Sequence, residues 1–252
     1  METIFIKEGD NLQEKIDEAI LKSSKLVIKK GLYETTPLFI KGALTLEFEE
    51  GATLLATTNE ALYQNIKTRV AGIEMEWYPA LLNVIGTSNV TIKGQGILDG
   101  NGPYWWNKYW GLDMKGGYRK IYDEKGLRFA ADYDCKRPRN LLVQNSSNVK
   151  IYDITSTSSG FWNIHILYSN DILIENVKIK SEAINSPSTD GIDIDSSYNV
   201  VVNKVETNCN DDSVCIKSGR DFDGIRVGRP SHDITISNSI INKGFGVTIG
   251  SE

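Results

Sequence analysis

The 252-residue sequence is poor in the residues that mark metal-binding and disulfide-rich proteins. It has two histidines and three cysteines, Cys135, Cys209 and Cys215, with no Cys-x-x-Cys pair. We therefore expect neither a zinc site nor another metal site. The cysteines leave two alternatives open: Cys209 and Cys215 pair in an oxidising compartment, or all three are buried thiols.

The sequence also lacks an excess of positive charge and any long apolar run. Lys and Arg total 28 against 33 Asp and Glu, a net charge of −5, which argues against nucleic-acid binding. No run of 18 apolar residues occurs, so no membrane span is expected. Residues 1–6 are followed at once by Lys-Glu-Gly-Asp, unlike a signal peptide. We expect a cytoplasmic protein, or a secreted one whose leader has been removed; the oligomeric state stays open.

One helix is predicted near the N-terminus. Asp10 is a candidate cap, Gln13 follows three residues later as in a capping box, and the helix should end near Ser23. Apolar residues recur at helical spacing: Leu12, Ile16, Ala19 and Ile20.

Beyond this helix, short β-type segments repeat. Segments of the form Asn/Asp, apolar, any residue, apolar occur at 89–92, 148–151, 171–174, 199–202 and 233–236. A second series is interleaved with them at 163–166, 191–194, 214–216 and 247–249. Because a short strand buries its apolar face only by stacking on copies of itself, the repeat predicts an all-β parallel β-helix. The Asn residues suit left-handed bends and hydrogen bonds between coils, and the helix would cap the open end.

Residues 102–126 interrupt the repeat and begin with the aromatic run Pro-Tyr-Trp-Trp-Asn-Lys-Tyr-Trp at 103–110. We expect a long loop that projects from one coil. Two interpretations stay open: the aromatic rings pack beneath their own loop, or they form a wall on which sugar rings stack.

Two acidic motifs lie one repeat apart. Asp190 stands in Ser-Thr-Asp-Gly, and Asp211 and Asp212 stand in Asn-Asp-Asp-Ser. Coils stack about 4.8 Å apart, so Asp190 and Asp212 should lie one above the other with Asp211 beside them. Three crowded carboxylates repel one another, so the pKa of at least one must rise, as a general acid requires. The alternative is that these residues merely cap strand ends.

Positive charge follows the carboxylates, at Lys217, Arg220, Arg226 and Arg229. These cations either neutralise the cluster or hold an anionic substrate, and Lys217 is the favoured substrate contact.

The strand at 163–166 should lie one coil before Asp190, which makes Asn163 and His165 candidate substrate-binding residues. Asp193 and Asp195 alternate with two isoleucines and should face solvent, as a cleft floor or a solvated face.

Taken together, these residues resemble glycoside hydrolase family 28, the polygalacturonases and their relatives. The family motif Asn-Thr-Asp-Gly is similar to 188–191, and Asp-Asp matches 211–212 with its following Ile-Lys-Ser-Gly. Gly-Leu-Tyr at 31–33, Gly-Ile-Leu-Asp-Gly at 96–100 and Arg-Pro-Arg at 137–139 also resemble bacterial members.

The resemblance implies a right-handed β-helix that hydrolyses pectic polymers with inversion and without a metal or other cofactor. By motif, Asp211 would be the general acid, while Asp190 and Asp212 would activate water. An inverting pair is expected to be about 6.5–9.5 Å apart.

The sequence departs from the family pattern in two places. Polygalacturonases usually carry Gly-His-Gly where residues 244–246 are Gly-Phe-Gly, and this loss resembles the rhamnogalacturonan-cleaving branch. The Arg-x-Lys motif of the later coils is absent, so we expect a domain over 1–252 that lacks its C-terminal coils and exposes an apolar edge.

The function that we predict is hydrolysis of galacturonic-acid-containing pectic saccharides. The substrate contacts would come from four residues: Asn163, His165, Lys217 and Arg220. Two rivals remain, a calcium-dependent pectate-lyase-like eliminase and a non-catalytic carbohydrate-binding β-helix, because fold alone does not decide function.

Overall fold

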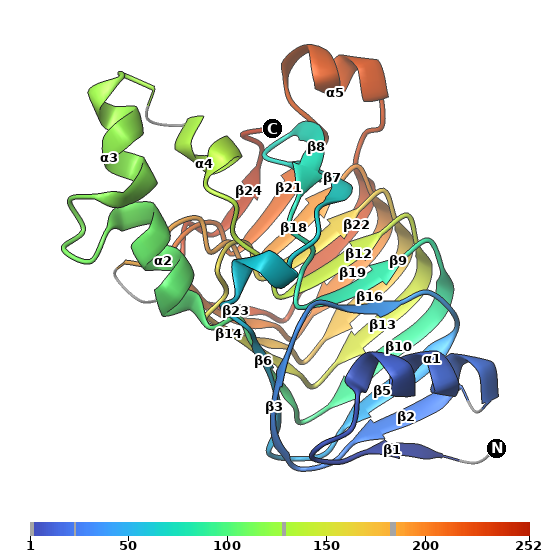
Figure 1. The fold of residues 1–252 in the computed structure, drawn as a ribbon. Coiled ribbons are helices and arrows are strands. Elements are labelled where there is room, and N and C mark those ends of the chain that lie inside the picture. The colour runs from blue at the N-terminus through green and yellow to red at the C-terminus, as the bar shows by residue number, and fades with distance from the viewer. Residues whose placement is uncertain (1–2, 23, 128–129, 182–184) are drawn as a thin grey trace.

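The chain winds into a right-handed parallel β-helix whose three walls are parallel sheets (Figure 1). A computed structural model describes residues 3–22, 24–127, 130–181 and 185–252. The first sheet consists of β1 (Ile4–Ile6), β2 (Lys25–Ile28), β5 (Leu44–Phe48), β10 (Ser88–Gly94), β13 (Ser147–Tyr152), β16 (Asn170–Glu175), β19 (Tyr198–Asn203) and β22 (His232–Ser237). The second consists of β3 (Gly31–Thr35), β6 (Ala52–Ala56), β11 (Ile97–Asp99), β14 (Thr155–Thr157), β17 (Lys178–Ser181), β20 (Glu206–Cys209) and β23 (Ile240–Lys243). The third consists of β4 (Leu38–Ile40), β9 (Leu82–Ile85), β12 (Leu141–Gln144), β15 (Ile164–Leu167), β18 (Ile192–Asp195), β21 (Val214–Lys217) and β24 (Val247–Ile249).

The two predicted series of segments form two of these walls. In the first sheet, equivalent apolar residues of successive coils pair in register: Val90, Val149, Ile172, Val200 and Ile234. In the third sheet the corresponding column is Ile164, Ile192, Val214 and Val247. Inward side chains alternate with outward ones along each strand, so these columns merge into one buried apolar core, except at the last coil, where Val247 is exposed. The β-helix prediction is confirmed.

Asn and Asp at the strand entrances adopt the left-handed bend that the sequence indicates. Asn89 and Asn148 have φ angles of 62° and 49°. Asn148 Nδ2 donates a hydrogen bond to Asn89 Oδ1 of the preceding coil at 2.7 Å, and Asn199 binds Asp171 in the same way. Asn and Asp pay a smaller penalty for this conformation than other side chains, and the stacked side chains join the coils.

Helix α1 (Leu12–Lys22) covers the open N-terminal end of the β-helix (Figure 1). Its buried side chains are Leu12, Ile16 and Ala19. The cap is Asn11 rather than the predicted Asp10, because Asn11 Oδ1 accepts the amide of Glu14 at 3.3 Å and Asn11 Nδ2 donates to Glu14 Oε1 at 2.9 Å. Gln13 instead exchanges two hydrogen bonds with the backbone of Phe39, at 2.9 and 2.8 Å, which ties the helix to the third sheet.

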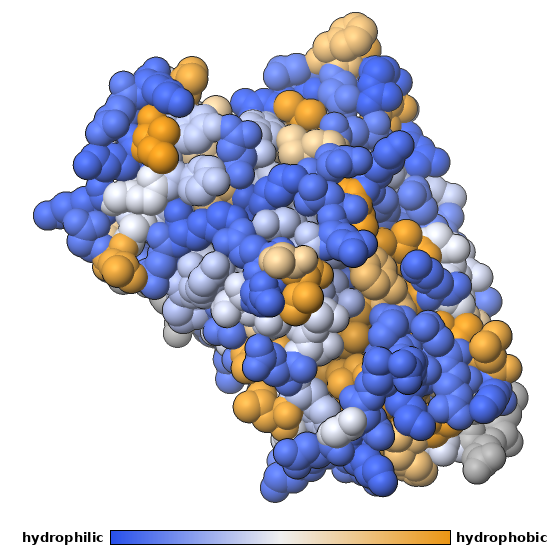
Figure 2. Space-filling view, in the orientation of Figure 1, coloured by the Kyte–Doolittle hydropathy of each residue, from blue (hydrophilic) through white to orange (hydrophobic). Residues whose placement is uncertain are grey.

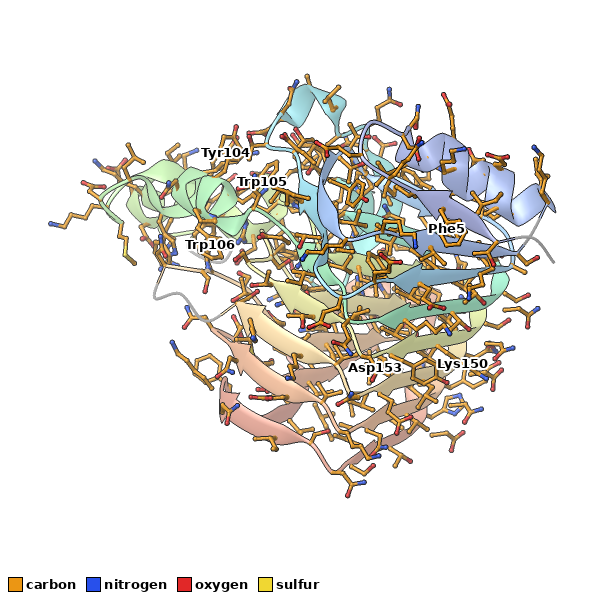
Figure 3. The ribbon with its side chains drawn as sticks, turned by 90° about the horizontal axis from the view of Figure 1, so that it is seen from below. Phe5, Tyr104, Trp105, Trp106, Lys150 and Asp153 are labelled. Atoms are coloured by element: carbon orange, nitrogen blue, oxygen red, sulfur yellow. The ribbon has the colours of Figure 1, made fainter. Side chains whose placement is uncertain are left out.

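The predicted long loop at 102–126 is wrong, since this segment is mostly helical. It forms α2 (Gly102–Trp110) and α3 (Gly117–Glu124), and α4 (Ala131–Asp134) follows. Trp105 and Trp106 of α2 are buried against the β-helix, and Trp106 Nε1 donates to Ser159 O at 2.8 Å (Figure 3). Burial of these indole rings holds the helical segment in place.

Three further elements lie outside the coils. The short 3-10 helix η1 spans Glu60–Leu62, and the antiparallel hairpin of β7 (Ile66–Val70) and β8 (Ile73–Trp77) follows it. Helix α5 (Asp221–Val227) follows β21. The hairpin lies over the outer face of the third sheet (Figure 1).

Several apolar side chains of the last coil are exposed: Ile240, Ile241, Phe245, Val247 and Ile249. Figure 2 shows separate apolar patches within a mostly hydrophilic surface on the face in view.

The three cysteines are free and buried: Cys135, Cys209 and Cys215. The disulfide alternative is therefore wrong. None of the helices in the described part of the chain is long and apolar enough to cross a membrane.

Candidate active site

The entrances of β18 and β21 bring the three predicted carboxylates together. Ile192 pairs with Val214, so Asp190 and Asp212 occupy equivalent positions two residues before their strands. The amide of Gly191 donates to Asp212 O at 2.8 Å and locks the two entrances in register. One oxygen from each of Asp190, Asp211 and Asp212 lies within 4.8 Å of the others. Stacking of coils therefore converts a separation in sequence into a cluster.

The residues around Asp190 hold its backbone firmly. A Cβ at Gly191 would lie 2.4 Å from Ser213 O, so the motif has room only for glycine at this position. Thr189 Oγ1 donates to Ser181 O at 2.9 Å and accepts the amide of Asn210 at 3.3 Å. The hydroxyl thus links the Asp190 entrance to the Asp211 entrance.

Burial, together with the neighbouring carboxylates, raises the pKa values of Asp190 and Asp211. Burial, followed by the charge of Asp212, raises the pKa of Asp211 to about 6. Burial also raises the pKa of Asp190 well above its ordinary value, with further contributions from Asp193 and Asp211. Asp211 can therefore carry a proton in weakly acidic solution, as a general acid must.

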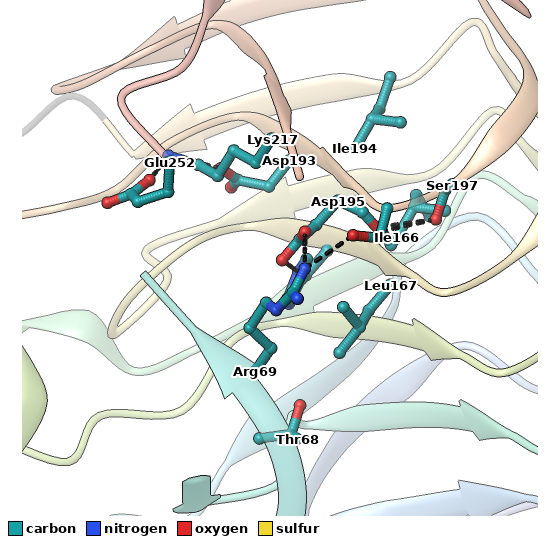
Figure 4. Close-up of polar contacts among 12 residues, drawn as sticks. Thr68, Arg69, Ile166, Leu167, Asp193, Ile194, Asp195, Ser197, Lys217 and Glu252 are labelled. Carbon is teal, nitrogen blue, oxygen red and sulfur yellow. Dashed lines mark hydrogen bonds and ion pairs between the residues drawn. The ribbon is translucent and has the colours of Figure 1, made fainter. Parts of the chain in front are cut away.

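Lys217 lies beside the cluster and is only 5% exposed at its side chain. Its Nζ is 2.6 Å from Glu252 Oε2 and 3.8 Å from Asp193 Oδ1 (Figure 4). Burial opposes its charge, but Asp193, Asp190 and Glu252 outweigh that effect and hold its pKa above the ordinary value. The ammonium group also lies over the ring of Trp162, 5.2 Å from its centroid.

The prediction that Asp193 and Asp195 face solvent is wrong, because both are fully buried. Their side chains do point outward from the third sheet, but the hairpin of β7 and β8 covers that face. Arg69 of β7 donates to Asp195 Oδ1 at 2.8 Å and to Ser196 Oγ at 2.7 Å (Figure 4). His165 and Arg69 outweigh the effect of burial and lower the pKa of Asp195.

His165 is also fully buried and does not line the cleft. Arg139 lies 2.6 Å from His165 Nδ1, and an arginine can only donate, so Nδ1 accepts and Nε2 carries the proton. His165 Nε2 faces Asp195 Oδ2 at 3.5 Å. Burial lowers the pKa of His165 to about 4, so the ring is neutral.

Asn163 is buried inside the coils rather than exposed to substrate. Its Oδ1 accepts the hydroxyls of Ser156 and Ser181, both at 2.9 Å, while Nδ2 donates to Asp190 O at 3.0 Å. This geometry supports the backbone of Asp190 and leaves no amide atom free for a substrate.

The predicted cation Arg220 lies apart from the carboxylates. Its guanidinium donates to Tyr133 Oη of α4 at 2.7 Å. Its backbone N–H donates to Gly72 O at 2.9 Å, and this bond ties the start of α5 to the hairpin tip. Arg226 is engaged by Glu74 and Asp223 and is likewise no part of the carboxylate cluster.

The carboxylates line a cleft of about 420 Å³, within the usual range of ligand sites. Four aromatic residues also line it: Tyr109, Trp110, Phe161 and Trp162. The packing interpretation of the aromatic run is confirmed for Trp105 and Trp106, which are buried. Tyr109 and Trp110 line the cleft, where sugar stacking stays a prediction.

Sequence reasoning missed Arg119 and Glu252 as cleft residues, and Arg69 as the partner of Asp195. The hairpin had a detectable signal, because two alternating runs flank Ala71-Gly72 at the turn. No sequence signal indicated that the hairpin packs over the third sheet. Arg119 lies in α3, within the segment for which the sequence predicts a loop.

The chain is similar to known pectinases. The model of "Glycosyl hydrolases family 28" matches residues 64–252. A probable polygalacturonase of Vitis vinifera is 28% identical over 219 residues, covering 84% of this chain and 40% of the relative. An endo-polygalacturonase of Pectobacterium parmentieri is 26% identical over 230 residues, covering 86% of this chain and 50% of that protein. The chain thus spans about half or less of these relatives.

Solved structures of polygalacturonases are similar to this chain in fold. A hyperthermoactive exopolygalacturonase from Thermotoga maritima superimposes with a TM-score of 0.79 at 28% identity, over 97% of this chain and 60% of that one. A polygalacturonase from Erwinia carotovora ssp. carotovora has the same fold, with a TM-score of 0.73 at 21% identity, over 100% of this chain and 66% of that one. The matched family model covers three quarters of the sequence and includes all three clustered aspartates. The chain belongs to glycosyl hydrolase family 28.

Proposed function

We propose that this chain hydrolyses galacturonic-acid-containing pectic saccharides. The observation that carries the proposal is the cluster of Asp190, Asp211 and Asp212 within 4.8 Å in an aromatic-lined cleft. Aromatic faces suit the apolar faces of sugar rings, and a carboxyl group with a pKa of about 6 suits proton donation.

In the mechanism that we propose, Asp211 protonates the glycosidic oxygen as the bond to the leaving sugar breaks. Asp190 and Asp212 orient and deprotonate the attacking water. The coupled carboxyls divide this work, because one must hold a proton while another has lost its own. Burial and the charge of Asp193 raise the pKa of Asp190, and Lys217 partly offsets them in favour of the ionised form that a base needs.

Lys217 and Arg119 supply positive charge at the cleft for the carboxylate of a uronic acid. Arg220 lies outside this group, and we assign it to the contact between α5 and the hairpin. Asn163 and His165 act as positioning residues in place of the substrate contacts expected from the sequence, since Asn163 donates a hydrogen bond to Asp190 O and His165 Nε2 faces Asp195 Oδ2.

The stereochemistry needs its own test. Inversion follows from the family resemblance and from the proposed attack of water activated by Asp190 and Asp212, and retention through a covalent intermediate is the alternative. Proton NMR of the first-formed product decides, because inversion of an α-linkage yields the β-anomer and retention yields the α-anomer.

Two pectic backbones are candidate substrates, homogalacturonan and rhamnogalacturonan. The side chain of Phe245 stands where polygalacturonases carry histidine and is 75% exposed, while its amide donates to Asp211 O at 3.0 Å. The backbone of 244–246 therefore supports the Asp211 entrance without a histidine. The missing histidine, as in the rhamnogalacturonan-cleaving branch that the sequence resembles, favours rhamnogalacturonan. A cytoplasmic location would restrict the enzyme to imported oligosaccharides, so intact polymer as substrate favours the secreted alternative.

The experiment incubates the protein separately with homogalacturonan and rhamnogalacturonan fragments and measures new reducing ends and ultraviolet absorbance. A hydrolase yields reducing ends alone. Absorbance from an unsaturated product would establish the lyase rival, and no product from either polymer would establish the non-catalytic rival. Asp211→Asn should remove the reducing-end signal while circular dichroism stays unchanged.

A further inference from the structure

A second cavity, of about 520 Å³, shares no lining residue with the carboxylate cleft. The hairpin forms one side through residues of both its strands, including Thr68 and Met75. The C-terminal ends of β12 and β15 form another side, through Gln144 and the neighbouring Tyr168. Arg229, which follows α5, completes the lining.

The side chain of Gln144 lines this cavity and carries an acceptor without a partner among the described residues. Its Nε2 donates to Lys67 O at 3.0 Å, which fixes the orientation of the amide. The residue is only 8% exposed, and its Oε1 is buried without a hydrogen-bond partner within the described parts of the chain. An acceptor buried without a partner is unfavourable, so this oxygen is suited to a ligand that brings a hydroxyl group.

Arg229 supplies a positive charge to the same cavity. Its guanidinium lies over the ring of Tyr168, 5.1 Å from the centroid, and has no carboxylate partner among residues 3–22, 24–127, 130–181 and 185–252. The neighbouring Arg226 differs, because it pairs with Glu74 and Asp223. Stacking on Tyr168 positions Arg229 while leaving its N–H groups free for an anion.

Of the two acidic lining residues, Glu74 already has partners and is not free to pair with Arg229. Glu74 is occupied by Arg226 and by the hydroxyl of Tyr168, which donates to Glu74 Oε1 at 2.8 Å. Glu76 is exposed and can accept hydroxyl groups, and Lys67 adds a second cation to the lining. The cavity thus combines acceptors for hydroxyl groups with cations for a carboxylate.

We propose that this cavity is a binding site for a sugar acid, separate from the carboxylate cleft. Gln144 Oε1 accepts a ring hydroxyl and Arg229 pairs with the carboxylate. The volume falls in the range of small-molecule sites, about 300–1,000 Å³. The proposal concerns binding alone, so it stands or falls independently of hydrolysis in the cleft.

Methionine-methyl NMR tests the proposal at the cavity itself. Met75 lines the cavity, whereas Met114 lies between α2 and α3 and lines neither hollow. The protein is labelled with ¹³C at methionine methyl groups and titrated with D-galacturonate, D-galactose and acetate. We expect a saturable shift of the Met75 signal with galacturonate, a Kd at least about tenfold weaker for galactose and for acetate, and no shift of Met114.

Variants separate the two recognition elements. Arg229→Gln should weaken galacturonate binding at Met75 by about tenfold or more, and Gln144→Leu should weaken it as well. Lys150→Gln removes an exposed charge on β13 of the first sheet (Figure 3) and should leave the Kd unchanged. Arg229 and Gln144 lie outside the cleft, so reducing-end release should stay at the unsubstituted rate.

An unmoved Met75 signal at millimolar galacturonate would overturn the proposal. Equal binding of galactose or acetate would overturn the assignment to a sugar acid. Because Arg229 is exposed, Arg229→Gln keeps the test decisive even if Gln144→Leu impairs folding.

Discussion

Replacing Asp211 with Asn should make the protein more stable at alkaline pH while removing its activity. Burial and the charge of Asp212 raise the pKa of Asp211 from an ordinary 3.8 to about 6. At about 1.36 kcal/mol per pKa unit, ionising Asp211 in the folded protein costs up to about 3 kcal/mol of the free energy of unfolding. Asn has no charge to bury, and its Oδ1 can still accept the Asp212 amide that Asp211 Oδ1 accepts at 3.0 Å.

The sign of the effect depends on pH. Because the folded-state pKa lies above the unfolded one, the protonated carboxyl stabilises the fold fully below about pH 3.8, and that stability is lost as the pH rises through about 6. Guanidinium unfolding should therefore show the Asn variant up to about 3 kcal/mol more stable than the unsubstituted protein at pH 8, and nearly equal to it at pH 3.5.

The matched control is Asp134→Asn at the exposed end of α4, which should change the free energy of unfolding by less than about 0.5 kcal/mol at either pH. Reducing-end release by Asp211→Asn should fall by about 10²–10⁴-fold. An Asn variant no more stable than the unsubstituted protein at pH 8 would refute the claim that ionised Asp211 lowers the free energy of unfolding.

Further changes test other parts of the site. A pH–rate profile of kcat/KM should fall above about pH 6, where Asp211 loses its proton; a flat profile to pH 8 would exclude it as the acid. Arg69→Met should lower the free energy of unfolding by about 3–5 kcal/mol because it leaves the buried Asp195 carboxylate without its cationic partner, and adding Asp195→Leu should recover part of the loss in denaturant titrations. Gly191→Ala places a Cβ 2.4 Å from Ser213 O, so it should reduce kcat more than tenfold, with circular dichroism as the check on folding. EDTA should leave the rate unchanged, because the proposed steps use protons and water alone; loss of activity that calcium restores would favour the lyase rival.

Grouping carboxyl groups at one site lowers the stability of the fold when they ionise, and it also raises their pKa values to a range useful for proton transfer. Asp190, Asp193 and Asp211 all have raised pKa values, and burial is the first cause for each. Lys217 balances part of this charge at the cleft, where it also pairs with Glu252. A protein selected for stability alone would not place three carboxylates at neighbouring strand entrances, so the arrangement is itself evidence for catalysis.

Local pattern was sufficient for the fold because the β-helix repeats itself. Each coil buries the same inward positions, so the spacing of Ile172, Val200 and Ile234 already contained the register found between β16, β19 and β22. The same logic placed Asp190 over Asp212. The helical structure of the aromatic run at 103–110 could not be predicted in this way, because its rings are buried by packing against coils that are remote in sequence.

The sequence by itself determined the coil repeat, the capping helix and the meeting of Asp190, Asp211 and Asp212, since each follows from a periodicity that neighbouring residues share. Tertiary structure alone decided what covers the outer face of the third sheet. Alternation along β18 shows that Asp193 and Asp195 point away from the core, but only the packed hairpin turns that outer face into an interior and supplies Arg69. A side chain's direction is a local property, whereas its exposure depends on every segment that packs above it.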